Sequence, residues 1–176
     1  DRIEHRAEAR QGNTDYALLL AEYYLSGNDP AAALIYFERL IAAGATAPEI
    51  LGKAAQAEFL AADRELSAQA RSRAEQALAV NPMQSAALAT LGMAAFEEAD
   101  YQGAISYWQK LRALEAPGSP GHNMLGQVIA RAEQELAAAG GLITAPAGPA
   151  PATEEATADG VVALEIALST QAKVPD

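Results

Sequence analysis

A pattern that recurs every 34 residues constrains this chain more than any other feature of its sequence. With Ser85 taken as position 1, small residues stand at positions 8 and 20, and larger apolar residues surround them. The residues that define this copy are Leu88, Leu91, Gly92, Ala95, Ala104 and Trp108. A repeat of this length is one supersecondary unit that cannot bury its apolar face alone, so successive copies must stack. The period therefore predicts a helical solenoid.

The same register extends in both directions from this copy. One earlier copy begins at Leu51 and carries alanines at positions 4, 7, 11, 20, 24 and 27, and another begins at Thr14. From Ser119 onward the first-helix residues recur, but no partner helix follows. The spacing is that of the tetratricopeptide repeat (TPR), and a lone final helix covers the last apolar surface of such a solenoid. We therefore predict an all-α fold, a TPR superhelix of three helix-turn-helix repeats followed by a C-terminal capping helix.

Residues that start and stop helices support this division. Asp29 and Asp100 each stand where a side chain can cap the second helix of a repeat, and Gly44 stands where a helix ends. The expected helices are 14–26, 30–43, 48–62, 66–80, 83–98, 101–114 and 120–138. The predicted TPR domain spans residues 14–139, with repeats at 14–47, 51–84 and 85–118 and the capping helix at 119–139.

The segments on either side of the repeats differ from them in composition. Residues 1–13 alternate charges at helical spacing, which predicts either the end of an upstream helix with its linker or a frayed, charged terminus. Residues 140–159 are rich in Gly, Pro, Ala and Thr without any apolar period, which predicts a flexible linker. Apolar residues then alternate within 160–176, as in a β-strand. Because a single strand is not stable alone, we expect this segment to be the first strand of a truncated β domain.

The charge balance and the missing residue types exclude several functions. The chain has 12 Lys and Arg against 23 Asp and Glu, a formal charge of −11, which argues against a nucleic-acid surface. It contains no cysteine, so thiolate metal sites and cysteine nucleophiles are excluded. The two histidines, His5 and His122, lie far apart in the sequence, and His122 is expected to pack between helices. We therefore predict no catalytic residue, no metal and no cofactor, and we do not expect an enzyme.

The candidate site is the concave face of the predicted solenoid, to which positions 2, 5, 9 and 12 of each first helix should point. The candidate peptide-binding residues at these positions are Leu18, Glu22, Leu25, Ala55, Phe59, Ala62, Ala89, Met93, Phe96, Asn123 and Gln127. Large apolar side chains on an open face favour a covering partner, here an amphipathic helix that carries Lys or Arg on its polar side. The alternative is a superhelix so tight that these side chains pack on one another.

The end of the sequence makes a family resemblance specific. A final Leu125-Gly126 helix and a Pro/Ala-rich linker precede a strand-like segment and a short Ala-Lys-Val motif. The residues that carry the match are Val162, Leu164, Ile166, Leu168 and Ala172-Lys173-Val174. This arrangement resembles the periplasmic part of the c-type cytochrome biogenesis factors known as CcmI or CycH, which are related to NrfG.

The resemblance implies an apocytochrome c chaperone that acts in cytochrome c maturation. Members of that family hold the C-terminal helix of apocytochrome c and deliver it to the haem ligation machinery. They lie in the periplasm and are attached to the inner membrane through an N-terminal anchor, which we expect upstream of this sequence. The family has no fixed catalytic motif, so no residue can be assigned a catalytic role. The alternative function is a structural TPR scaffold that assembles a periplasmic envelope complex.

Overall fold

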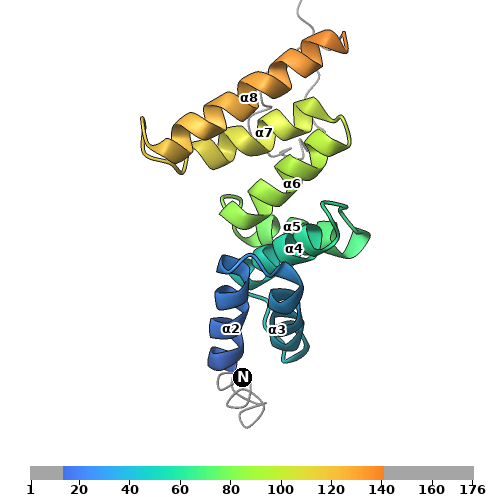
Figure 1. Ribbon diagram of the computed structural model, residues 1–176, viewed down its shortest axis with the longest axis vertical. Coiled ribbons are helices and arrows are strands. Elements are labelled where there is room, and N and C mark those ends of the chain that lie inside the picture. Colours follow the sequence, from blue (N-terminus) through green and yellow to red (C-terminus); the bar gives the residue numbers. More distant parts are fainter. Residues whose placement is uncertain (1–13, 141–176) are drawn as a thin grey trace, which may run out of the picture. The chain divides into compact units, whose positions relative to one another are not determined.

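In the computed structural model, residues 14–140 are described, and they form seven α-helices joined by short turns (Figure 1). The helices are α2 (Thr14–Ser26), α3 (Pro30–Ala42), α4 (Pro48–Ala61), α5 (Ala68–Val80), α6 (Ser85–Glu97), α7 (Tyr101–Arg112) and α8 (Pro120–Ala138). Each lies within two residues of the bounds expected from the sequence, so the predicted helical fold is confirmed. The predictions for residues 1–13, and for the linker and strand from residue 141 onward, lie outside the described residues.

Short polar side chains cap the helices where the sequence predicted them. The Asp29 carboxylate accepts a hydrogen bond of 3.0 Å from the backbone N–H of Ala32 at the start of α3. Asp100 caps α7 in the same way, through the N–H of Gly103 at 3.0 Å. These bonds satisfy backbone donors that have no partner within the helix. Just after α3, Gly44 adopts a φ of +92°, a conformation that glycine reaches at little cost.

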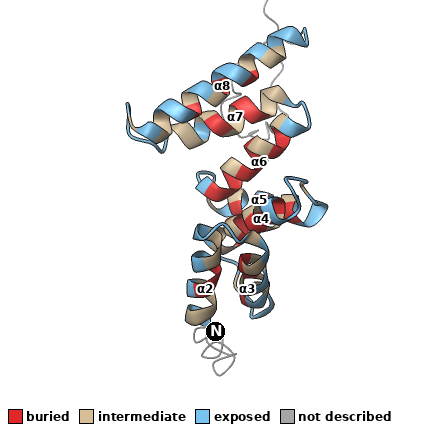
Figure 2. Cartoon of the chain, viewed as in Figure 1, coloured by how far each residue is buried: buried red, intermediate tan, exposed pale blue. Residues whose placement is uncertain are grey.

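The core consists of alanines packed against a few large side chains. In the first repeat, Ala21 and Ala33 occupy the two small-residue positions, and both are fully buried beside Phe37. In the third repeat, Trp108 packs into a cluster that includes Ala104 and residues of α8. Buried residues gather where neighbouring helices face each other (Figure 2). Small side chains at these contacts let the helices approach closely enough to bury the large ones.

Contacts between repeats enclose the central helices more than the terminal ones. Each second helix packs against the first helix of the next repeat, which pairs α3 with α4, α5 with α6 and α7 with α8. In addition, α4 packs against α6, so α4 has neighbours in α3, α5 and α6. The helix α8 covers α7, as expected for a capping helix.

The second repeat departs from the small-residue pattern at one of its helix contacts. Its position 8 is Glu58, whose carboxylate accepts hydrogen bonds from Arg73 of α5, at 2.9 Å, and from the Ser67 hydroxyl. The guanidinium of Arg73 also pairs with Glu38 of α3 at 2.7 Å. The turn between α4 and α5, residues 62–67, is longer than the corresponding turn at 27–29 in the first repeat. A buried ion-pair network thus replaces a contact between small residues.

Two glycines at position 8 of their repeats are predicted to respond in opposite ways to alanine. A Cβ at Gly92 would lie 2.4 Å from Nε1 of Trp108, whereas a Cβ at Gly126 would come no closer than 3.6 Å to Arg112. Gly92→Ala should therefore lower the free energy of unfolding by about 1–3 kcal/mol through overpacking. Gly126→Ala should raise it by about 0.5–1 kcal/mol, because alanine favours the helix. Chemical denaturation followed by circular dichroism measures both changes, and equal effects would contradict the predicted Trp108 contact.

Candidate functional site

The accessible part of the predicted site lies on the first helices of the repeats and is here named the first-helix face. It comprises Leu18, Glu22, Leu25, Ala62, Ala89, Met93, Phe96, Asn123 and Gln127. The polar members and Ala62 are exposed, whereas the leucines, Ala89, Met93 and Phe96 are half-buried. The face therefore presents partly covered apolar side chains between exposed polar ones.

Two residues predicted for this face belong to the core instead. Phe59 and Ala55 are both 0% exposed, so the prediction that they line an open channel is wrong. The reason is the position of α4, which packs against α3, α5 and α6. At position 9 of the second repeat, the surrounding helices cover the ring completely. For Phe59 and Ala55, the tight-packing alternative is the correct one.

An ion pair joins α2 to α4 at the first-repeat end of the face. Nζ of Lys53 lies 2.5 Å from a carboxylate oxygen of Glu22. Beside it, Leu18 and Leu25 are half-buried and pack against the core cluster of the first repeat. Since an exposed ion pair contributes only about 0–1 kcal/mol, Lys53 remains available to exchange Glu22 for another carboxylate. Glu22, the carboxylate predicted for the groove, thus already has a cationic partner within the protein.

An aromatic cluster joins α6 to α7 and α8 at the other end of the face. The Phe96 ring centroid lies 5.3 Å from that of Tyr101 and 5.7 Å from that of Trp108. The guanidinium carbon of Arg131, on α8, lies over the same ring at 5.4 Å from its centroid. Met93 is half-buried in the same cluster. Phe96 is therefore held in place on one side by aromatic rings and covered on another by a cation.

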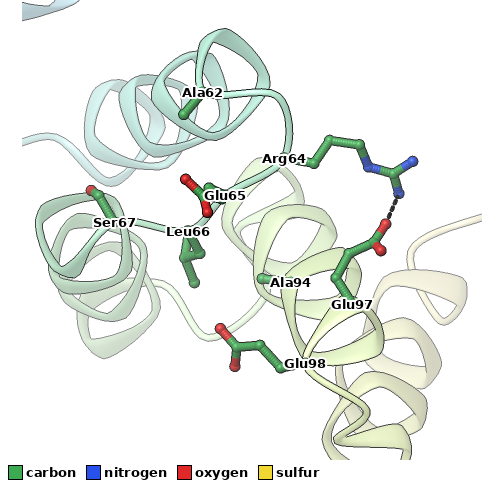
Figure 3. Close-up of a pocket in the computed structure, with 8 residues that line it drawn as sticks. All are labelled: Ala62, Arg64, Glu65, Leu66, Ser67, Ala94, Glu97 and Glu98. Carbon is green, nitrogen blue, oxygen red and sulfur yellow. Dashed lines mark ion pairs between the residues drawn. The ribbon is translucent and has the colours of Figure 1, made fainter.

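A pocket of about 460 Å³ lies between the α4–α5 turn and the end of α6. Three of the residues that line it are apolar, and Figure 3 shows the Leu66 side chain turned into the space between the helices. The residues that line it are Ala62, Arg64, Glu65, Leu66, Ser67, Ala94, Glu97 and Glu98. Through Ala62, this pocket is continuous with the first-helix face.

The charges that line this pocket are predominantly negative. Arg64 pairs with Glu97 at 2.9 Å, and Glu98 pairs with Arg71 of α5 at 2.6 Å. The carboxylate of Glu65 lies outside these pairs. The C-terminal ends of α4 and α6 also point here, and their unpaired carbonyl groups favour positive charge. The pocket is suited to a basic side chain, whose alkyl part can lie along the apolar walls.

Within residues 14–140, no group of three or more His, Asp or Glu side chains could hold a metal ion. No helix in this part of the chain is long and apolar enough to cross a membrane. His122 is half-buried between α7 and α8 with Nδ1 enclosed, which agrees with its predicted packing position. Burial, and secondarily the carboxylate of Glu75, raise the pKa of Tyr107, so this phenol stays neutral and serves as a packing residue.

Two residues of the site lie beside the positions predicted from the repeat register. Arg131 follows position 12 of the last helix by one residue, and Glu65 lies in the turn after α4. A departure from the repeat pattern marked this turn: the aspartate that caps the second helix in the other repeats is replaced here by Leu66. Glu97 and Glu98 are exposed and pair with two different arginines.

The fold has a close counterpart among solved structures. The crystal structure of the Sgt2 TPR domain from Aspergillus fumigatus matches with a TM-score of 0.58, covering 81% of this chain and 91% of that chain at 22% identity. At this level of identity the match shows the fold. Together with the helix order and the small-residue contacts, it defines this chain as a TPR domain.

Sequence similarity narrows the class further. The chain is 31% identical over 175 residues to the cytochrome c-type biogenesis protein CycH of Pseudomonas aeruginosa, which covers 99% of this chain. It is 30% identical over 115 residues, 65% of its length, to NrfG, a formate-dependent nitrite reductase complex subunit of Escherichia coli O157:H7. No family model matches. The chain is a TPR domain of the kind found in cytochrome c biogenesis factors such as CycH.

The similarity involves only part of each relative. The chain spans 42% of the length of CycH and 58% of the length of NrfG.

Proposed function

We propose that this domain is an apocytochrome c chaperone in cytochrome c maturation, which binds the C-terminal amphipathic helix of apocytochrome c on its first-helix face. The observation that carries the proposal is the similarity to CycH over 99% of the chain. A chaperone for an unfolded cytochrome must hold a segment that has not yet packed into its own core. An amphipathic helix is such a segment, because its apolar face is uncovered until the cytochrome folds.

The first-helix face has the composition that such a helix requires. Leu18, Leu25, Met93 and Phe96 offer apolar contacts that are already partly ordered by the core beneath them. Ordered contact residues lose little further conformational freedom on binding, which favours affinity. The acidic pocket beside Ala62 accommodates a Lys or Arg from the polar side of the helix.

The proposal also specifies the cellular compartment in which the domain acts and the proteins that it contacts. In the cell, the domain works in the periplasm as the part of an inner-membrane protein that captures the client. Bound apocytochrome c is passed to the machinery that ligates haem. The domain itself performs no covalent step, so neither a metal nor a cofactor is required for its role.

A structural scaffold is the second candidate function. Solenoids offer large surfaces on both sides, and a scaffold would assemble an envelope complex without a peptide in the groove. Titration with a C-terminal apocytochrome c peptide separates the two candidates. A chaperone binds the peptide saturably, whereas a scaffold does not respond to it.

Phe96→Ala is predicted to weaken binding of this peptide at least about tenfold, and a loss of about 2 kcal/mol would correspond to about thirtyfold. The ring is the largest apolar side chain that remains accessible on the first-helix face, and the loss of a central aromatic anchor typically costs about 2 kcal/mol. Isothermal titration calorimetry with the purified domain measures the change. Leu114→Ala is the matched control, because Leu114 is 45% exposed but lies in the turn after α7, away from the face.

The circular dichroism of both variants should remain that of the folded helical domain. If Phe96→Ala binds the peptide as tightly as the wild type, the ligand does not rest on the first-helix face. If the wild type does not bind the peptide at all, the chaperone function is excluded in favour of the scaffold.

A further inference from the structure

We propose that Arg131 determines ligand choice: held over the Phe96 ring, it binds a carboxylate that the ligand helix carries beside its apolar face. This inference rests on the proposed function, which supplies the helix but not its charge pattern. The Arg131 guanidinium would give the first-helix face a positive charge that recognises the ligand, in a chain whose formal charge is −11.

Among residues 14–140, no ion pair joins Arg131 to a carboxylate, whereas Lys53, Arg64, Arg71 and Arg73 each pair with a glutamate. Arg112 at the α7–α8 contact also has no ion pair among these residues, but its Nε is enclosed. Glu135 lies one helical turn beyond Arg131 on α8, at a spacing that permits an ion pair. Arg131 nevertheless lies over Phe96 of another helix. Its charge is therefore available to a ligand.

A guanidinium over an aromatic ring is attracted to the ring face, and this attraction occupies no carboxylate acceptor. The five N–H donors of the group lie in one plane and remain free for such an acceptor. A carboxylate can then accept two of these hydrogen bonds without displacing Arg131 from the ring. Because the ring holds the guanidinium in advance, little side-chain freedom is lost when the carboxylate binds.

The position of Arg131 and Phe96 beside the other contact residues also favours a contact with the ligand. Phe96 is itself a predicted contact residue, and Met93 lies beside it in the same cluster. Arg131 extends from α8, which places the cation on the α8 side of the ring, while the acidic pocket lies on the α4–α5 side of α6. A helix that rests on Phe96 is thus offered a cation on one side and carboxylates on the other. This asymmetry selects one orientation of the ligand.

The test uses two synthetic peptides with the C-terminal helix of a c-type cytochrome. They are identical except that one has glutamate and the other glutamine at a position flanking the apolar face. The wild-type domain should bind the glutamate peptide about tenfold more tightly. Arg131→Gln should reduce the affinity for the glutamate peptide to that for the glutamine peptide and leave the latter unchanged. Isothermal titration calorimetry gives both affinities for each variant.

Arg39→Gln is the matched control, because the Arg39 guanidinium lies 5.0 Å from the centroid of Tyr36 on α3, away from the first-helix face. It should leave both affinities unchanged. The inference is overturned if the wild type binds both peptides equally, or if Arg131→Gln raises the affinity for both peptides equally. In either case Arg131 only covers the Phe96 ring, and the proposed chaperone function is unaffected. If the wild type binds neither peptide, the chaperone function itself fails.

Discussion

Phe59→Ala is expected to lower the free energy of unfolding by about 3–5 kcal/mol, the range for removing a fully buried aromatic side chain. The ring is 0% exposed on α4, and this helix is flanked by α3, α5 and α6. Truncation leaves a cavity among helices that other contacts hold in place, so the void can close only in part. Chemical denaturation followed by circular dichroism measures the change.

The neighbouring residue on the same helix provides the control. Leu60 is 36% exposed, and Leu60→Ala should lower the free energy of unfolding by about 1 kcal/mol or less. If Phe59→Ala unfolds at the wild-type denaturant concentration but no longer binds the peptide, Phe59 belongs to the binding face and not to the core. The experiment thus decides between the position expected from the repeat register and the burial observed in the fold.

The helices of this protein were predictable because the signals that define them are local. A capping aspartate such as Asp29 acts on a backbone N–H three residues away. Small residues recur at position 20 of all three repeats and at position 8 of the first and third, so the helix pairing that buries Ala21 against α3 could also be predicted. Both signals depend only on residues within one repeat.

The burial of Phe59 depended on information that lies between repeats. The register indicates the direction in which a side chain leaves its helix, but the distance to the next helix decides whether that side chain is covered. The same position in the first repeat is occupied by Glu22, which is exposed because α2 packs mainly against α3 among the described helices. Position 9 is therefore exposed in the first repeat and buried in the second.

The pairing of side chains across helices was equally inaccessible to the sequence analysis. Arg131 and Phe96 meet although they belong to different repeats, and Arg73 reaches glutamates of both α3 and α4. Many acidic residues were available as partners for each arginine, and a repeat pattern does not choose among them. Such choices depend on the packed positions of the helices, which emerge only when the repeats are stacked.

Arg73→Met is expected to lower the free energy of unfolding by about 3 kcal/mol. The side chain is 7% exposed and binds Glu58, itself only 16% exposed, together with Glu38. Methionine retains much of the apolar stem but leaves the Glu58 carboxylate largely buried without its cation, which is the costly outcome for a buried ion pair. Arg71→Met is the control: Arg71 lies on the same helix with a 42% exposed side chain, and its pair with Glu98 should contribute only about 0–1 kcal/mol.

A second variant distinguishes an unpaired charge from lost packing. If Arg73→Met destabilises the protein because Glu58 is left buried and charged, Arg73→Met combined with Glu58→Leu should recover most of the lost stability. Leucine fills the space at the α4–α5 contact without needing a partner, and Glu38 is exposed enough, at 44%, to be solvated alone. If the double variant is less stable than Arg73→Met, the network stabilises the protein through its hydrogen bonds. Glu58 at position 8 then contributes to the stability of the second repeat.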